Sequence, residues 1–118
     1  LVGSEMCIRD RYVTMLPKSI TTAIGIGISE ELGGIVTITV AVIIITGILG
    51  NVIADTVFHI FKIKNPLAKG LALGTASHAI GTARAIEMGP VEGAMSSLAV
   101  AVAGLLTVVF VSGFAQLI

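Results

Sequence analysis

The chain has 118 residues, of which 55% are hydrophobic and 12% are charged, and its mean hydropathy is +1.06. Soluble domains carry about 25% charged residues, so this composition is typical of a membrane protein. Seven basic residues balance seven acidic ones, and without a long basic run nucleic acid is excluded as a partner. The single cysteine, Cys7, excludes an internal disulfide and a cysteine-based metal site.

The first eleven residues, LVGSEMCIRDR, differ from the rest of the chain because they hold four of its charged side chains. They lack the layout of a signal peptide, and GSEMCIRDR resembles a translated sequencing adaptor. We therefore predict that residues 1–11 are a non-native segment and that residues 12–118 form one membrane domain. A genuine amphipathic or disordered arm is the alternative.

Residues 13–29, VTMLPKSITTAIGIGIS, are apolar but are interrupted by Pro17 and Lys18. A tilted span, a re-entrant hairpin and a helix broken near the midplane all fit this pattern. Proline suits the first turn of a helix, so a half-helix starting here would direct free backbone N–H groups, Lys18 and Ser19 at an anion. The alternative is an ordinary helix start at the water boundary, with Lys18 reaching the headgroups.

Two long stretches without ionisable side chains predict membrane-spanning helices. Residues 35–54 are twenty in number, which at 1.5 Å per residue gives about 30 Å, the thickness of the hydrocarbon layer. This helix is expected to continue to about Phe61. Residues 93–118 are also free of charge, and their glycine and alanine positions suit close contact with a neighbouring helix.

Short connections separate the apolar segments. They are EELGG at residues 30–34, KIKNP at residues 62–66 and EMGPVEG at residues 87–93. The lysines at and just after KIKNP place that loop in the cytoplasm. The EELGG and EMGPVEG turns are then predicted on the opposite side of the membrane.

The segment GLALGTASHAIGTARA, residues 70–85, is the least expected feature of so apolar a chain. Eleven of its sixteen residues are Gly, Ala, Ser or Thr, and His78 and Arg84 lie among them. Polar and cationic groups in a membrane are costly unless they face protein or water. Residues 67–88 are long enough to span, but a tilted span, a re-entrant hairpin and a broken helix are all open.

In a continuous helix, the spacing i, i+3, i+7, i+10 places four residues on one stripe: Gly74, Ser77, Gly81 and Arg84. The adjacent stripe holds Thr75, His78 and Thr82. Hydroxyls, an imidazole and a guanidinium suit a small carboxylate, which arginine can grip with two hydrogen bonds. Close helix packing through small residues is the alternative, and Arg84 is also spaced to pair with Glu87.

No metal site, cofactor site or enzyme active site is predicted. His78 has no second histidine, cysteine or carboxylate at the spacing of a metal site. The chain contains no nucleophile elbow, no phosphate-binding loop and no zinc pattern. The expected protein is therefore not an enzyme.

Four motifs in this order, PKSITT, ISEELGG, LALGTASHAIGTARA and EGAMSSLAVAVAGLLT, resemble the LrgB/CidB family of bacterial inner-membrane proteins. The resemblance covers nearly all of residues 18–118, and SHAIGTARA is its most specific part. Family members are about twice this length, so the chain resembles their C-terminal half. One departure is Ala23, where members usually carry proline after the paired threonines, and it weakens the expectation of a helix break there.

The resemblance implies an all-α, polytopic transmembrane fold with broken or re-entrant segments, located in the bacterial cytoplasmic membrane. It also implies antiholin-like control of murein hydrolases and lysis, with a small LrgA/CidA-type membrane protein as partner. Related proteins move small carboxylates such as glycolate, glycerate or pyruvate. Homo-oligomers and contacts with membrane lipid are further expected.

We therefore predict transport of a small carboxylate as the function of the intact protein. Lys18 and Arg84 are expected to supply positive charge to the substrate. Hydrogen bonds are expected from Ser19, Thr21, Thr22, Thr75, Ser77, His78 and Thr82. His78 could instead take up a co-transported proton, because an unperturbed histidine has a pKa of about 6.5. An antiholin-like partner that assembles through its glycine and alanine faces is the alternative function.

Overall fold

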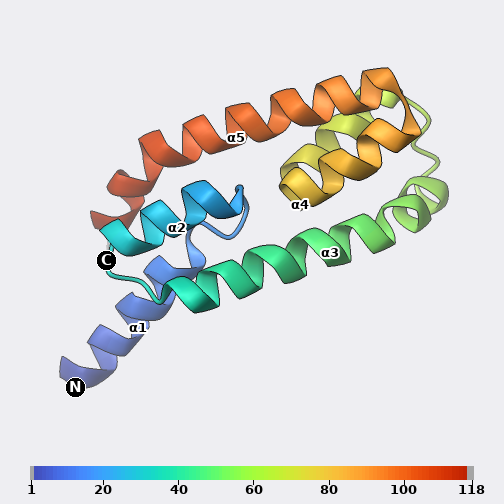
Figure 1. The fold of residues 1–118 in the computed structure, drawn as a ribbon. Coiled ribbons are helices and arrows are strands. Elements are labelled where there is room, and N and C mark those ends of the chain that lie inside the picture. The colour runs from blue at the N-terminus through green and yellow to red at the C-terminus, as the bar shows by residue number, and fades with distance from the viewer. Residues whose placement is uncertain (1, 117–118) are drawn as a thin grey trace.

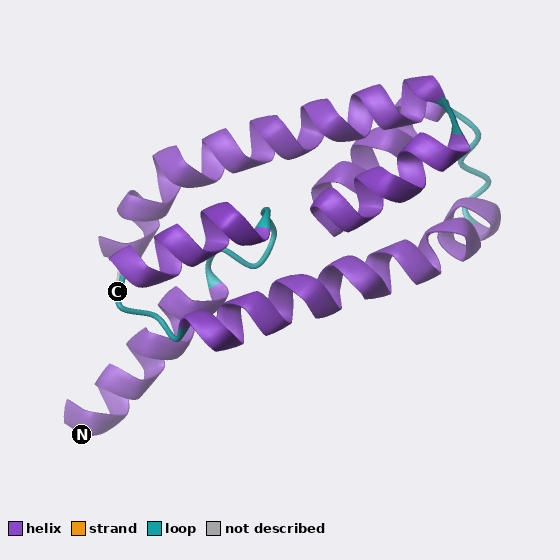
Figure 2. Cartoon of the chain, in the orientation of Figure 1, coloured by secondary structure: helices purple, strands orange, loops and turns teal. Residues whose placement is uncertain are grey.

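The computed structural model describes residues 2–116, and helices occupy most of this range (Figure 2). In chain order these helices are α1 (Val2–Met15), α2 (Thr22–Glu31), α3 (Val36–Ile60), α4 (Pro66–Met88) and α5 (Pro90–Gln116). The molecule is elongated, with extents of 50 × 25 × 21 Å. The prediction of an all-helical chain is confirmed, and α1 continues without interruption past residue 12.

The two long apolar helices, α3 and α5, flank α2 and α4, whereas α1 projects beyond them (Figure 1). The mean hydropathy is 2.4 within α3 and 2.3 within Pro90–Val111, and both helices are long and apolar enough to cross a membrane. Their outer faces carry large apolar side chains such as Val52, which is 70% exposed, and Leu105, which is 67% exposed. Surfaces of this kind are unfavourable in water and suit contact with lipid.

Helix α4 is broken at His78, where φ is 45° and ψ is −126°. In its first half, Leu73 belongs to a buried cluster with Ala54 of α3. Four residues later on α4, Ser77 lies directly over Gly50, which precedes Ala54 on α3. The first half of α4 therefore runs antiparallel to α3.

The second half of α4 runs in the opposite direction. Ile80 packs over Gly47 of α3, and four residues further along, Arg84 pairs with Asp55. This half is therefore parallel to α3, and α4 as a whole is a helical hairpin (Figure 1). Gly81 permits the close approach of the two halves, because a Cβ there would lie 2.5 Å from the carbonyl oxygen of Leu73.

The hairpin places both ends of α4 at the same end of the molecule. Ile63, just before α4, and Met88, at its end, both pack against the buried cluster that contains Phe58. The prediction that residues 62–66 and residues 87–93 lie on opposite sides is therefore wrong. A continuous span would have separated them, whereas a chain that turns back at residue 78 returns to its starting side.

A buried hydrogen-bond network fixes the α1–α2 unit to α3. The hydroxyl of Thr39 donates to the carbonyl oxygen of Thr14 at 2.8 Å and lies 2.9 Å from the hydroxyl of Ser29. The side chains of all three residues are at most 2% exposed. Helices α1, α2 and α3 each supply one member of the network. The network therefore fixes α1 and α2, and with them the turn that joins the two, to α3.

We expect Thr39→Val to lower the free energy of unfolding by about 1–3 kcal/mol, because it leaves a buried carbonyl and a buried hydroxyl without their partner. Thr46→Val is the matched control, since the Thr46 hydroxyl bonds only to the carbonyl of Val42 in its own helix, at 2.7 Å. Unfolding in detergent, followed by circular dichroism, measures both variants. Equal losses for the two would show that the network carries no tertiary stability.

Candidate functional site

The turn between α1 and α2 and the break in α4 face each other in the middle of the molecule (Figure 1). The backbone of Lys18, in the turn, lies beside the imidazole of His78. Gly47 and Gly50, which contact the tip of the α4 hairpin, lie near the middle of α3. The two breaks therefore meet about halfway along the long apolar helices.

Three buried polar atoms around this meeting point have no hydrogen-bond partner among residues 2–116. They are Ser77 Oγ, His78 Nε2 and Asn51 Oδ1. His78 is 3% exposed and Ser77 is fully buried, so bulk water does not supply the missing hydrogen bonds. An unsatisfied buried polar atom costs about 1–3 kcal/mol, and in native proteins such atoms mark strained, catalytic or ligand-receiving positions.

The backbone at His78 adds strain to this arrangement. Residues other than glycine rarely adopt positive φ, and holding such a residue in this conformation costs about 1–3 kcal/mol. Backbone that is not helical is tolerated at membrane depth only where protein or water surrounds it. Here the break lies between α3, α5 and the α1–α2 turn (Figure 1), and His78 itself is buried while Ala79 next to it is exposed.

Two polar side chains of the α1–α2 turn lie on the surface of the chain. Lys18 and Ser19 are exposed, and the Lys18 ammonium donates to the Ser19 hydroxyl at 3.1 Å. Helix α2 begins at Thr22 and not at Pro17, so the predicted half-helix is shorter than expected. Thr21 precedes it with extended backbone and makes no capping hydrogen bond through its side chain.

Thr82 braces the hairpin from within. Its hydroxyl donates to the carbonyl oxygen of His78 at 2.8 Å and lies 2.8 Å from the hydroxyl of Ser96. Because a hydroxyl has one proton, Ser96 is the donor in the second bond. Thr82 therefore links the break in α4 to α5 and has little capacity left for a ligand.

The predicted single polar stripe on α4 is wrong, because the break at His78 separates its members into two antiparallel halves. Thr75 is exposed, and its hydroxyl donates to the carbonyl of Leu71 in its own helix at 2.8 Å. Arg84 lies six residues beyond the break, about 9 Å of helix. It pairs with Asp55 and, at 2.8 Å, with Glu87.

The structure thus brings the backbone of Lys18 beside the His78 imidazole. It places the Ser77 hydroxyl against Gly50 of α3 and leaves Thr75 and Arg84 away from this junction. The guanidinium of Arg84 is held by two carboxylates at the end of the molecule, with its side chain 37% exposed. The pairing of Arg84 with Glu87, three residues later, is the alternative to substrate binding that the sequence spacing indicated. No group of three or more metal-ligating side chains occurs in the described part of the chain.

Asn51 and Ser96 are site residues that the sequence analysis missed. Asn51 is the one side-chain amide in the charge-free residues 35–54, and an amide in a membrane span requires a partner or a cavity. That signal was available in the sequence. The role of Ser96 was not readable, because its contact with Thr82 depends on the fold of the hairpin.

Comparison with known proteins gives the family. A family profile described as "LrgB-like family" matches residues 7–117. A Bacillus subtilis (strain 168) protein named "Antiholin-like protein LrgB" is 47% identical over 105 residues, which cover 89% of this chain and 46% of that protein. A Bacillus mycoides (strain KBAB4) protein of the same name is 48% identical over 101 residues, covering 86% of this chain and 44% of that protein.

The chain spans a little under half the length of these curated relatives. No solved structure matches the chain. The matched residues include the α1–α2 turn, the α4 hairpin and both long apolar helices. The chain therefore belongs to the LrgB-like family of membrane proteins.

Proposed function

We propose that the intact protein carries a small organic carboxylate across the bacterial cytoplasmic membrane, and that the substrate binds where the α1–α2 turn meets the break in α4. The observation that supports this most directly is the buried His78 Nε2, which has no partner within residues 2–116 and lies next to Lys18. A substrate oxygen would supply the missing hydrogen bond. Such sites at the junction of broken helices are a recurring feature of transporters.

The electrostatics of the junction favour an anion. Helix α2 and the second half of α4 both begin here, and the first N–H groups of each helix have no acceptor within it. The N-terminal ends of helices carry partial positive charge. The ammonium of Lys18 adds a full positive charge, while the carboxylates Asp55 and Glu87 are occupied by Arg84 at the far end of the hairpin.

In this proposal the carboxylate binds Lys18, Ser19 and the free N–H groups. Ser77 and His78 bind the remaining polar group of the substrate, a hydroxyl or keto oxygen in a two- or three-carbon acid. Thr21 and Thr22 lie half-buried at the start of α2 and would supply further hydroxyls to the substrate. Transport of a proton with the substrate would use the unpartnered Nε2 of His78.

Uptake into proteoliposomes that contain the intact protein tests the proposal. With a panel of two- and three-carbon acids, we expect Lys18→Gln to reduce uptake about tenfold or more, because a hydrogen bond to a charged group is worth about 1.5–3 kcal/mol. Lys18→Arg is the matched control and should retain most activity. Full uptake by Lys18→Gln, or no uptake of any acid by the wild-type protein, would contradict the proposal.

An antiholin-like role is the second candidate, and one structural feature favours it. The two halves of the α4 hairpin expose several small side chains: Ala72, Thr75, Ala76, Ala79 and Ala83. Small residues allow helices to approach closely in membranes, so the exposed parts of the hairpin suit an LrgA/CidA-type protein or a second copy. If this is the function, Lys18→Gln leaves control of lysis unchanged in cells and wild-type proteoliposomes take up no carboxylate.

A further inference from the structure

A basic cavity lies at the end of the molecule where α3 passes into α4. Its volume is about 560 Å³, and three lysines line it: Lys62, Lys64 and Lys69. Asp55 is the single carboxylate of the cavity wall within the described residues, and Arg84 already engages it. None of the three lysines forms an ion pair within residues 2–116, so the cavity carries an excess of positive charge.

The walls of this cavity combine charge with apolar surface. The ammonium of Lys69 lies 5.9 Å from the centre of the Phe58 ring, a distance at which a cation is attracted to the face of an aromatic ring. Ile63 forms part of the same wall. A ligand in the cavity would therefore meet cationic groups and hydrocarbon together.

Lys62 stands in a backbone position that favours glycine. Its φ is 53°, and its N–H bonds to the carbonyl of His59 while the N–H of Ile63 bonds to the carbonyl of Phe58. This is the Schellman pattern that ends many helices, and its left-handed residue is usually glycine. A lysine here carries backbone strain that glycine would avoid, and its side chain lines the cavity.

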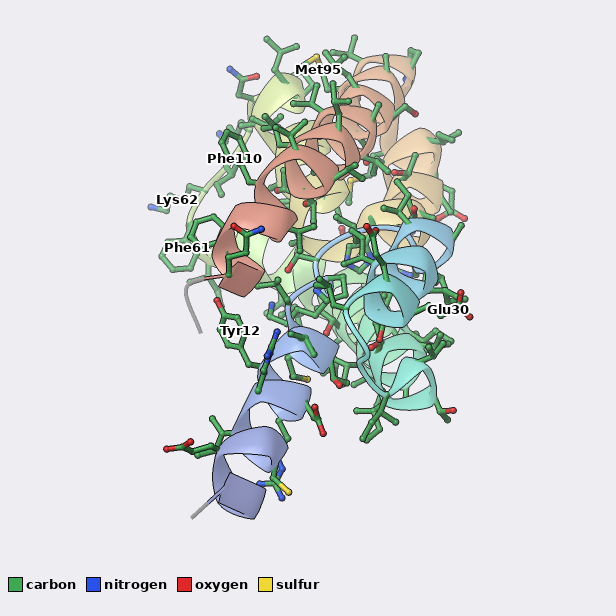
Figure 3. All side chains as sticks on the ribbon, turned by 90° about the vertical axis from the view of Figure 1, so that its left-hand side faces the viewer. Tyr12, Glu30, Phe61, Lys62, Met95 and Phe110 are labelled. Atoms are coloured by element: carbon green, nitrogen blue, oxygen red, sulfur yellow. The ribbon has the colours of Figure 1, made fainter. Side chains whose placement is uncertain are left out.

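Exposed apolar side chains continue from the cavity onto the outer face of α3. Ile60 is 66% exposed and Phe61 is 72% exposed, and Phe61 and Lys62 project away from the ribbon on the same side (Figure 3). This position, at the end of an apolar helix long enough to cross a membrane, is the level at which phospholipid headgroups lie. Basic pockets beside such helices bind anionic headgroups.

We propose that this cavity binds the headgroup of an anionic phospholipid, with the phosphate between the three lysines and the acyl chains along the exposed apolar face of α3. The apolar continuation distinguishes a lipid from a free phosphate ion, which would have no contact with Ile60 or Phe61. The proposal is independent of carboxylate transport, because no residue of the junction at His78 takes part in it.

Native mass spectrometry of the intact protein in neutral detergent tests the site, with phosphatidylglycerol, phosphatidylcholine and inorganic phosphate as probes. We expect preferential retention of phosphatidylglycerol that inorganic phosphate does not displace. The variant Lys62→Gly should lose about fivefold in affinity for phosphatidylglycerol, since one lysine near a lipid surface contributes about that factor. Its unfolding midpoint should equal or exceed that of the wild type, because glycine suits the backbone at residue 62.

The combined change Lys62→Gly, Lys64→Ala and Lys69→Ala should lower the affinity about a hundredfold, and arginine at all three positions is the charge-matched control that should retain it. Equal binding of phosphatidylcholine would overturn the proposal, as would unchanged phosphatidylglycerol binding by the triple variant. Displacement by inorganic phosphate would also overturn it, in favour of a free-anion site.

Discussion

Replacing Gly74 with leucine is expected to disrupt the packing of α4 against α5 and to lower the free energy of unfolding. A Cβ atom at this position would lie 2.8 Å from the Cβ of Ala99 and still closer to the carbonyl oxygen of Ser96. The obstacle on one side is backbone, which cannot rotate away as a flexible side chain can. We expect a loss of about 3 kcal/mol or more, since overpacking by even a few methylene groups costs 1–3 kcal/mol in a well-packed core.

Gly27→Ala is the control for this experiment. Gly27 lies in α2 with nothing within 4 Å of an added Cβ, so alanine there should stabilise the helix by about 0.5–1 kcal/mol. Unfolding of purified protein in mixed micelles, followed by circular dichroism, measures both variants. If Gly74→Leu unfolds at the wild-type midpoint, α4 and α5 do not approach as closely as the structure shows.

At position 78, glycine is expected to give a more stable protein than alanine. Both replacements remove the imidazole and its unpartnered Nε2, so they share the loss of packing and the gain from removing a buried polar atom. They differ in the backbone, because φ at residue 78 is positive. Glycine adopts this conformation without strain, so His78→Gly should exceed His78→Ala in free energy of unfolding by about 1–3 kcal/mol.

The sign of this difference distinguishes a hairpin from a continuous helix. In a helix interior, alanine is more stable than glycine by about 1 kcal/mol, which is the opposite order. The measurement compares the two unfolding midpoints directly and needs no assumption about the value of the imidazole. Alanine more stable than glycine would mean that residues 66–88 span as one helix and that the junction with Lys18 does not form.

Much of the fold was readable from the sequence alone. The charge-free residues 35–54 and 93–118 predicted the two long helices within a few residues, because hydrophobic length is a direct consequence of bilayer thickness. The motifs around PKSITT and SHAIGTARA predicted the family, which is confirmed. The sequence indicated His78 and Lys18 because a polar or charged group in a membrane segment is energetically costly unless it faces protein or water.

The tertiary structure decided what those groups face. A helical repeat places Arg84 in line with Ser77, but a single residue with positive φ at position 78 reverses the chain and sends Arg84 to Asp55 instead. No local sequence pattern predicts this reversal, because segments rich in glycine and alanine suit a close-packed spanning helix and a close-packed helical hairpin equally well. Composition thus determined which segments are long and apolar enough to cross a membrane, whereas contacts between residues distant in sequence determined where α4 turns back and which buried polar atoms have no hydrogen-bond partner within residues 2–116.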